Sequence, residues 1–484
     1  MLRMLVVTHR WLGIVLGPLF AMWFASGIVM HFVPFPQLDE SERVAGLAPL
    51  RLEGPIHGPA DAVIALGMTD ALRVRLLQRA DGPVYIVSGV LGSTALRASD
   101  LASASLPSSP LALVIGADYA AQRGMRAPDS AKITLIDYDQ WTVAGRYHRH
   151  RPLYRLALDD EVGTEIYISS KTGEVVLDTT RWERGWNFVG SVAHWIYLPQ
   201  LRSNPELWSA IVWWLSLVAL VSVLAGAILG IVRLRIDGTR RISPYQGMHW
   251  WHHVLGLSSL IFVTTWIFSG WLSMDDGRLF STARASNADI AAVSGAPPWE
   301  RLTDEELRRI DSSAREVEWF AFDGKLFRRE ITGQNSQRLA EIGDSGPERQ
   351  FLSLAAVRPI ALRLGTACGD PAEVSRADNY AIGSIMRESA VYRIACGDVW
   401  YDIDAANGAL LQKSDSSRRA YRWLYRALHT LDFPALAARP MLRTVLIVSL
   451  CAIGLLFSLT GLVIGCRRLW PHGSRRAALP RSSP

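Results

Sequence analysis

The sequence predicts a membrane protein with four transmembrane helices, arranged as two tandem repeats that each enclose an α+β domain outside the membrane. The first observation behind this prediction is an uneven distribution of charge. Charged residues make up 20% of the 484-residue chain, yet four stretches are almost free of them. Each is long enough to cross a bilayer, which takes about 20 apolar residues in a helix. The four stretches are residues 11–33, 207–232, 254–274 and 441–466.

The second observation is an internal duplication that is visible at two offsets. A shift of 243 positions carries His9 onto His252, and a shift of 235 positions carries His194 onto His429. The same shifts match Gly13 with Gly256, Trp23 with Trp266, Ser26-Gly27 with Ser269-Gly270, Gly173 with Gly408, Gly226 with Gly461 and Gly230 with Gly465. A duplication of this kind places equivalent residues across a pseudo-two-fold axis. Two histidines related in this way can both reach one metal ion.

These observations divide the chain into alternating membrane and extramembrane segments. The expected segments are span one at 1–33, an outer domain at 34–206, span two at 207–233, a cytoplasmic hinge at 234–253, span three at 254–274, an outer domain at 275–440, span four at 441–466 and a cytoplasmic tail at 467–484. Span one exceeds the apolar run of a signal peptide, about 7–15 residues, and is therefore expected to be retained.

Positive charge sets the expected orientation of the chain. Arg3 and Arg10 precede the first span, and further arginines crowd the hinge and the tail. Because short cytoplasmic loops are enriched in Lys and Arg, both termini are expected in the cytoplasm and both outer domains in the periplasm. The net charge of +6 reflects this topology, and no motif indicates a nucleic-acid partner.

The two outer segments show matching local patterns. Each is expected to hold a helix followed by a strand, and each ends in a β-hairpin with a glycine turn. The helix and strand pairs are 59–67 with 72–78 and 303–309 with 316–322, the hairpins are 164–177 and 399–411, and the expected loops are 101–110 and 285–298. Cys368 and Cys396 lie in the second outer segment, where oxidation favours a disulfide over two buried thiols.

The span-end histidines carry the chemistry. Isolated, they would serve as polar anchors at the membrane surface, and a proton relay would need further ionisable groups that the spans lack. Haem ligation needs neutral imidazoles beside an apolar pocket, one from each side of a flat ring. The duplication supplies such pairs: His9 with His252, and His194 with His429. Zinc is less favoured because no cysteine or carboxylate cluster accompanies them.

Several other residues remain open at this stage. His249 or His253 could replace His252, and His31 falls opposite Met274 under the 243 shift, as in a His/Met haem site. His148 and His150 are expected on a solvated basic strand edge, or to meet an anionic substrate. Four arginines near the outer histidines form a positive rim or meet haem propionates or an anionic chelate: Arg181, Arg184, Arg418 and Arg419. The glycines matched at 226, 230, 461 and 465 suit close helix packing.

Three short motifs resemble the PepSY-associated transmembrane family. They are Thr-His-Arg-Trp-Leu-Gly at 8–13 leading into a span with Ser26-Gly27, the hairpin from Tyr167 to Val175, and Leu-His-Thr-Leu-Asp-Phe-Pro at 428–434. In the second domain Asn407-Gly-Ala replaces the Thr-Gly-Glu of the first. The resemblance covers essentially the whole chain. It implies a multi-pass protein of the bacterial inner membrane with two periplasmic PepSY-like domains, and the family's histidines match His9, His194, His252 and His429.

Members of this family include haem-containing reductases of ferric siderophores. The resemblance therefore implies a haem-dependent oxidoreductase with two b-type haems, which takes electrons from a cytoplasmic reductant or a membrane quinol and reduces Fe(III) to Fe(II) in the periplasm. Hard hydroxamate or catecholate oxygens favour Fe(III), so reduction releases the iron. The alternative is a non-enzymatic, membrane-anchored PepSY module that binds or regulates a periplasmic partner. The sequence leaves the siderophore, the electron donor and the oligomeric state open.

Overall fold

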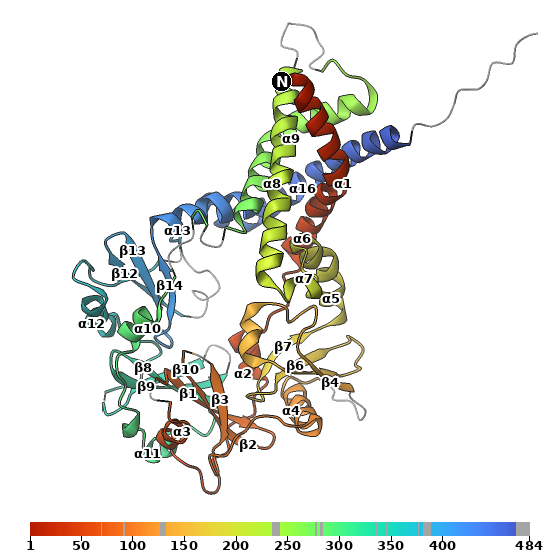
Figure 1. Ribbon diagram of the computed structural model, residues 1–484. Coiled ribbons are helices and arrows are strands. Elements are labelled where there is room, and N and C mark those ends of the chain that lie inside the picture. Colours follow the sequence, from red (N-terminus) through yellow and green to blue (C-terminus); the bar gives the residue numbers. More distant parts are fainter. Residues whose placement is uncertain are drawn as a thin grey trace, which may run out of the picture.

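Four helices of the computed structural model are long and apolar enough to cross a membrane. They are α1 (Leu2–Phe32), α8 (Pro205–Val232), α9 (Gly247–Leu272) and α16 (Pro440–Leu469). Helices α1 and α9 each pack against both α8 and α16, so α1 and α9 lie on a diagonal of the bundle. The sheets lie at one end of the bundle, and the N-terminus lies at the other (Figure 1). The structure describes residues 1–68, 70–90, 92–125, 132–234, 243–275, 278–280, 284–333, 336–344, 346–375, 377–380 and 389–470.

Two of these helices extend beyond the apolar stretches of the sequence. Helix α1 begins at Leu2 instead of residue 11, and α9 begins at Gly247 instead of residue 254, so His252 lies within α9. The polar ends can stay helical at a membrane surface because their amphipathic side chains, such as Arg10 in α1 and Trp250 in α9, have an apolar body and a polar tip.

The extramembrane part is centred on a six-stranded antiparallel sheet with the order β10-β9-β8-β1-β2-β3. Its strands are β1 (Arg73–Arg79), β2 (Gly82–Ser88), β3 (Ser93–Arg97), β8 (Glu316–Phe322), β9 (Lys325–Gly333) and β10 (Ser336–Glu341). The sequence suggests a separate domain in each half, whereas this sheet joins the halves through β1 and β8. Arg75 lies opposite Glu318, its match under the 243 shift. The pairing provides hydrogen-bond partners for the backbone N–H and C=O groups of β1 and β8, which would otherwise lie at exposed sheet edges.

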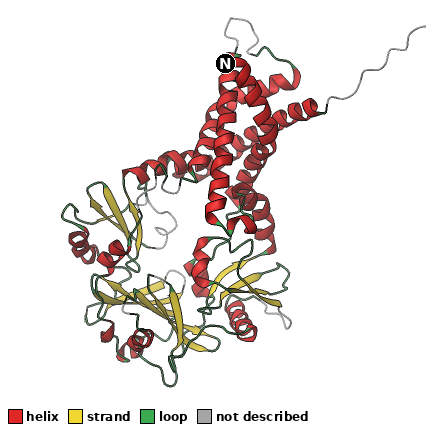
Figure 2. Ribbon diagram, in the orientation of Figure 1, coloured by secondary structure: helices red, strands yellow, loops and turns green. Residues whose placement is uncertain are grey.

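Each half also carries a smaller, four-stranded antiparallel sheet (Figure 2). The first has the order β4-β5-β6-β7 and the second β11-β12-β13-β14. Their strands are β4 (Lys132–Ile136), β5 (Leu153–Ala157), β6 (Glu165–Ser169), β7 (Val175–Thr179), β11 (Ala372–Glu373), β12 (Val391–Cys396), β13 (Val399–Asp404) and β14 (Leu410–Ser414). Both predicted hairpins are confirmed. Gly173 and Gly408 turn them with φ of 71° and 67°, a conformation that favours glycine.

Shorter helices connect the sheets with one another and with the bundle. They are α2 (Glu40–Ala45), α3 (Pro59–Leu66), α4 (Ser109–Gln122), α5 (Arg181–Asn187), α6 (Ala193–Trp195), α7 (Pro199–Arg202), α10 (Asn287–Ser294), α11 (Glu305–Arg308), α12 (Leu354–Leu364), α13 (Ser416–Tyr421), α14 (Leu428–Thr430) and α15 (Pro434–Ala437). The described residues also form two 3-10 segments, η1 (Gly145–His150) and η3 (Trp299–Arg301), and two π segments, η2 (Phe188–Val192) and η5 (Arg422–Ala427).

Two local predictions are wrong and one is confirmed. The expected loop 285–298 contains helix α10, because Ser286 and Asp289 form a reciprocal capping box at its start. The segment with His148 and His150 is the 3-10 helix η1 and not a strand edge. Cys368 and Cys396 form the expected disulfide.

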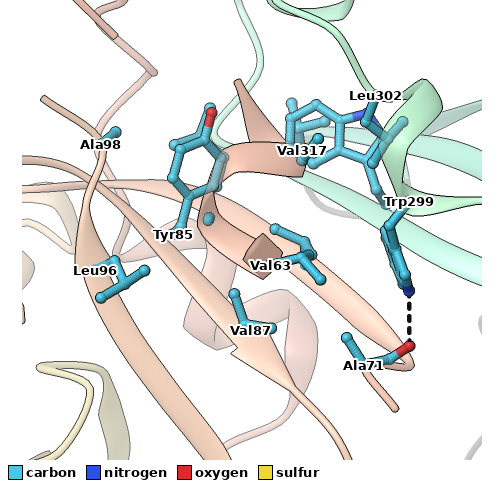
Figure 3. Packing of buried hydrophobic residues seen from close by; sticks show 14 of the residues in the cluster. Val63, Ala71, Tyr85, Val87, Leu96, Ala98, Trp299, Leu302 and Val317 are labelled. Carbon is cyan, nitrogen blue, oxygen red and sulfur yellow. Dashed lines mark hydrogen bonds between the residues drawn. The ribbon is translucent and has the colours of Figure 1, made fainter. Parts of the chain in front are cut away.

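The largest apolar core mixes residues from both halves of the chain (Figure 3). Tyr85 and Val87 of β2 share this core with Val317 of β8 and with Trp299 of η3. The Trp299 indole N–H donates a 3.0 Å hydrogen bond to the Ala71 carbonyl, so the polar edge of this buried ring is satisfied. The two halves are therefore joined by packing as well as by strand pairing.

The joint between β1 and β8 also carries buried ion pairs. Glu316 accepts a 2.5 Å hydrogen bond from Arg43 of α2 and lies 3.5 Å from Arg75 of β1. Arg75 in turn lies 2.5 Å from Glu174, in the β6–β7 turn. Burial alone raises the pKa of Glu316, but the charges of Arg43 and Arg75 outweigh burial and hold the pKa at about 2. The network ties the segment that follows α1 to the strands of the second half.

The stability of this joint is expected to fall in acid. The folded pKa of Glu316 lies below the unfolded value of about 4.3, so its contribution is fully present above that pH and is lost as the pH falls towards 2. Thermal unfolding followed by circular dichroism in the β-sheet band should show a falling midpoint across this window. The Glu316→Gln variant should show a shallower decline. An equal slope in both proteins would contradict the assignment.

Candidate metal-binding sites

The structure brings the four predicted histidines together as two pairs. The His9 and His252 rings lie 6.2 Å apart between centroids, with their planes at 39°. The His194 and His429 rings lie 6.1 Å apart, at 69°. We call the first the N-terminal pair, since His9 lies near the N-terminal end of α1, and the second the sheet-side pair. Each pair takes one histidine from each half of the chain.

Interrupted helices position the sheet-side pair. His194 follows α5 and the π segment η2, and His429 follows α13 and the π segment η5. Single-turn π segments inside helices often accompany functional sites. Each helix stops two residues after its histidine at a left-handed residue, Ile196 with φ of 54° or Leu431 with φ of 51°. The same local geometry thus places both rings at the ends of helices that lead into α8 and α16.

Hydroxyl groups fix the orientation of the sheet-side rings. The Ser26 hydroxyl lies 3.0 Å from His194 Nδ1 and donates its own proton to the Met22 carbonyl at 2.6 Å. The Ser269 hydroxyl lies 3.1 Å from His429 Nδ1 and donates to a carbonyl of its own helix. A hydroxyl whose proton is already donated to another group can only accept a further hydrogen bond. Each Nδ1 is therefore assigned as the protonated nitrogen that donates to the serine. The lone pair of each ring is therefore on Nε2.

The N-terminal pair reaches the same state with different partners. His9 Nδ1 lies 3.0 Å from the Ser222 carbonyl, which can only accept. His252 Nδ1 lies 3.0 Å from the Thr460 hydroxyl, which donates to the Phe457 carbonyl at 2.6 Å. Both Nδ1 atoms therefore donate, and Nε2 carries the lone pair. Metal-binding histidines are commonly oriented by such a bond from the other ring nitrogen.

Within the described part of the chain, none of the four Nε2 atoms has a hydrogen-bond partner. An imidazole nitrogen binds a metal ion at about 2 Å, so two histidines that share one ion have ring centroids no more than roughly 6 Å apart. The observed separations of 6.2 and 6.1 Å fit this arrangement. No group of three or more His, Cys, Asp or Glu side chains suited to a metal occurs among the described residues. Each pair could therefore supply two protein ligands to a metal ion.

Glycines leave the space that the rings occupy. A Cβ atom on Gly226 of α8 would lie 2.5 Å from His9 Cε1, and one on Gly461 of α16 would lie 3.3 Å from His252 Cε1. On the sheet side, the corresponding distance from Gly270 to His429 is 3.4 Å. Gly226 and Gly461 thus lie against histidine rings, which adds to the helix-packing role that the sequence suggests for them.

Replacing Gly226 by alanine is expected to displace His9. The added methyl group would overlap the ring at 2.5 Å and break its bond to Ser222, so metal or cofactor binding at the N-terminal pair should fall by about tenfold or more. Gly27→Ala is the matched control, because its Cβ would lie at an ordinary 3.9 Å from His194. Absorption spectra of the two purified variants test this. Equal occupancy in both would contradict the spatial role of Gly226.

The remaining histidines of the bundle have other positions. Both ring nitrogens of His253 are bonded, to the Ser243 hydroxyl at 2.8 Å and the Gly230 carbonyl at 3.0 Å. His31 Nε2 lies 2.8 Å from the Thr444 hydroxyl, and His249 is exposed. The geometry therefore selects His252 as the partner of His9.

The arginines near the sheet-side pair have local partners. Arg184 donates to the Thr179 and Gly163 carbonyls, and Arg419 pairs with Asp398 at 2.6 Å. These bonds hold α5 and α13 against the ends of the small sheets. They favour a structural role for Arg184 and Arg419 over contact with a ligand.

The two pairs lie near opposite ends of one bundle. His9 and Ser26 are both on α1, and their positions correspond to about 25 Å of helix, close to the thickness of a bilayer core of about 30 Å. Apolar and aromatic side chains fill the bundle between them, including Leu16, Phe24 and Trp266. The space that separates the sites is therefore lined by apolar side chains.

Sequence reasoning missed the groups that orient the rings. The matched Ser-Gly dipeptides at 26–27 and 269–270 were the available signal, since a hydroxyl beside a small residue recurs in both halves. The N-terminal pair gave a weaker signal because its halves differ: Thr460 falls on Ala225, which has no hydroxyl. His9 uses the Ser222 carbonyl instead.

The fold and the histidine pairs define a multi-pass membrane protein with extramembrane α+β domains and two candidate metal sites in its helix bundle. The family described as PepSY-associated TM region matches residues 6–468, and the protein belongs to this family, as the sequence motifs predict. A comparison with curated proteins finds no match.

Proposed function

We propose that this protein transfers electrons across the bacterial inner membrane through two b-type haems and reduces ferric siderophores in the periplasm. The observation that carries the proposal is the meeting of histidines from both halves with Nε2 unbonded. Bis-histidine haem ligation needs two such nitrogens on opposite faces of a flat ring, whose own nitrogens supply the other ligands. His9 and His252 hold the haem on the cytoplasmic side, and His194 and His429 hold the one on the periplasmic side.

The orientation rests on positive charge. Arg3 and Arg10 lie in the first turns of α1, Arg233 directly follows α8, and Arg467 and Arg468 lie in the last turn of α16. The enrichment of such residues on the cytoplasmic side of membrane proteins supports a cytoplasmic location for both termini and a periplasmic location for the sheets. Electrons then move from the N-terminal pair towards the sheet-side pair.

The two halves are, on this proposal, tandem repeats related by a pseudo-two-fold axis. Three features support it. Each histidine pair takes one member from each half, and Ser26 and Ser269 each contact Nδ1 of a histidine. In the register of β1 and β8, Arg75 lies opposite Glu318, the residue that it matches under the 243 shift. On this proposal each repeat contributes one histidine to each site, so the two ligands of a haem come from equivalent positions of the two repeats.

When bound, the haems supply one-electron transfer between the donor and the ferric ion. The residues of the chain hold the cofactors, fix the imidazole orientation through Ser26, Ser269, Thr460 and the Ser222 carbonyl, and keep water from the bundle. A membrane quinol or a cytoplasmic reductant supplies the electrons. Each electron converts one Fe(III) to Fe(II), and the hard oxygen ligands of a siderophore hold Fe(II) less tightly. No side chain has to donate a proton.

Anaerobic turnover tests the proposed function. Protein in lipid nanodiscs is reduced with dithionite, freed of excess reductant and mixed with a ferric hydroxamate siderophore, while ferrozine traps Fe(II). The expected result is loss of the reduced haem bands with one Fe(II) formed for each electron lost. His249→Ala, a change at an exposed histidine, is the control and should behave as the unchanged protein.

The alternative is a membrane-anchored module that binds or regulates a periplasmic partner without redox chemistry. Protein that reduces no ferric chelate and lacks haem after expression in haem-supplemented cells would favour this alternative. If the protein contains haem but does not reduce the chelate, the proposed substrate is wrong, whereas electron transfer through the haems remains compatible with the result.

A further inference from the structure

A basic hollow on the first small sheet is not used by the proposed electron path. It is lined by Gly145, Arg146, His148 and Arg149 of the 3-10 helix η1 and by Lys171 of the β6–β7 turn. The side chains of these residues are exposed, and the lining contains no acidic residue. Three permanent positive charges therefore surround one concave surface.

These cations differ from most arginines of the same domain. Arg79, Arg155 and Arg184 each form a salt bridge with a carboxylate. Among the described residues, by contrast, no carboxylate forms a salt bridge with Arg146, Arg149 or Lys171. Arg146 donates to the Pro36 carbonyl, and Arg149 donates to His150 Nε2. Both guanidinium groups thus keep N–H donors for a further partner, and a guanidinium binds carboxylate or phosphate oxygens in bidentate fashion.

The field around the hollow is positive on more than one side. Partial burial and the charges of Arg151 and Arg202 lower the pKa of His148, so this imidazole is neutral at pH 7. A neutral imidazole can donate a hydrogen bond to an anion, and it adds no positive charge that the neighbouring arginines would repel. An anion entering the hollow therefore meets cations and one neutral donor.

The two elements that form the hollow are fixed to each other before any ligand arrives. The Ser169 hydroxyl donates to the His150 carbonyl at 3.0 Å, and the Ser170 N–H donates to the Pro152 carbonyl at 3.0 Å. The β6–β7 hairpin and η1 are thereby held in register. Binding then costs little ordering of backbone, which favours affinity.

The hollow is connected to the sheet-side pair by packing. Tyr147 lies between Arg146 and His148 in the sequence, and its buried ring belongs to the same apolar cluster as Trp141 and Val192. Val192 precedes His194 by two residues on the same continuous helical segment. The base of the hollow thus rests on the segment that carries one of the proposed haem ligands.

We propose that this hollow binds a small anionic chelate with several carboxylate groups, and so selects acidic ferric chelates for reduction at the sheet-side pair. The selection of a redox substrate rests on the proposed function, whereas the binding of the anion does not. The phosphate of an anionic lipid headgroup offers the same oxygen chemistry, and the experiment separates these two sources.

The test measures binding of gallium(III) citrate, which copies the charge of a ferric polycarboxylate and cannot be reduced under these conditions. The full chain in phosphatidylcholine nanodiscs is titrated by calorimetry. The Arg146→Gln, Arg149→Gln, Lys171→Gln triple variant should bind at least about tenfold more weakly, because it loses the charge-assisted hydrogen bonds of three cations to the anion. A second triple variant removes three exposed cations outside the hollow, Arg51→Gln, Lys132→Gln and Arg349→Gln, and should bind as the unchanged protein does.

Equal weakening in both triple variants would overturn the proposal in favour of general charge attraction, and so would unchanged binding in the first. Loss of citrate binding in nanodiscs that contain phosphatidylglycerol would assign the hollow to a lipid headgroup and reject the soluble ligand. Haem content is measured in the same samples. A protein without haem that still binds gallium citrate at the hollow would reject the proposed function alone.

Discussion

Replacing His429 by alanine is expected to remove one haem from this protein and to leave the other in place. His429 and His194 lie 6.1 Å apart between ring centroids, and on the proposed function the loss of one ring would leave the haem with a single histidine. The N-terminal pair lies about 25 Å away along α1 and shares no hydrogen bond with the sheet-side pair. The pyridine haemochrome assay, expressed per chain, should therefore fall to half of the value for the unchanged protein.

Three further variants complete this experiment. The double variant His194→Ala, His429→Ala should match the single variant, because both residues serve one site. His9→Ala should remove the other haem and leave the sheet-side spectrum. His253→Ala should keep both haems, since both ring nitrogens of His253 are bonded to the protein. Loss of both haems in His429→Ala, or of neither, would reject the assignment of the pairs.

Replacing Glu316 by glutamine is expected to have the largest effect on stability. Glu316 is 1% exposed and lies against two half-buried arginines, Arg43 and Arg75. Glutamine keeps the shape but removes the negative charge that Arg43 and Arg75 share, so that Arg75 keeps only its pair with Glu174. Breaking a buried pair in this way costs about 3–5 kcal/mol. The thermal midpoint of the extramembrane part, followed by circular dichroism in nanodiscs, should fall clearly at neutral pH.

Glu305→Gln is the matched control for this change. Glu305 pairs with Arg309 at 2.8 Å, but its side chain is 62% exposed. An exposed pair contributes about 0–1 kcal/mol, so the midpoint should hardly move. Equal effects of the two substitutions would show that burial at the β1–β8 joint does not strengthen the network.

Much of the bundle could be predicted from sequence because its signals are local or repeated. Four apolar stretches locate the spans, and the two shifts identify which histidines are equivalent. Equivalence in turn predicts proximity across a pseudo-two-fold axis, and His194 with His429 and His9 with His252 do lie close together. The small-sheet hairpins were equally predictable, because Gly173 and Gly408 mark turns that need positive φ.

The remainder depends on contacts between distant parts of the chain. Nothing local distinguishes His252 from His253, and only the approach of Ser243 and Gly230 shows that His253 is already bonded. Likewise, β1 and β8 each have an unremarkable strand pattern. Their pairing into one sheet follows from the way the two halves meet. The segment 285–298, which contains α10, is rich in alanine, serine and proline, which is typical of a loop, so the sequence prediction did not recognise its capping box.

Haem stoichiometry is the sharpest test of the proposal that the two histidine pairs bind haem. The protein is purified in nanodiscs from cells supplied with haem precursor, and the pyridine haemochrome is measured against protein mass. The predicted result is two b-type haems per chain, with a sharp Soret band and a reduced α band typical of bis-histidine ligation. Colourless protein from the same cells would contradict the account.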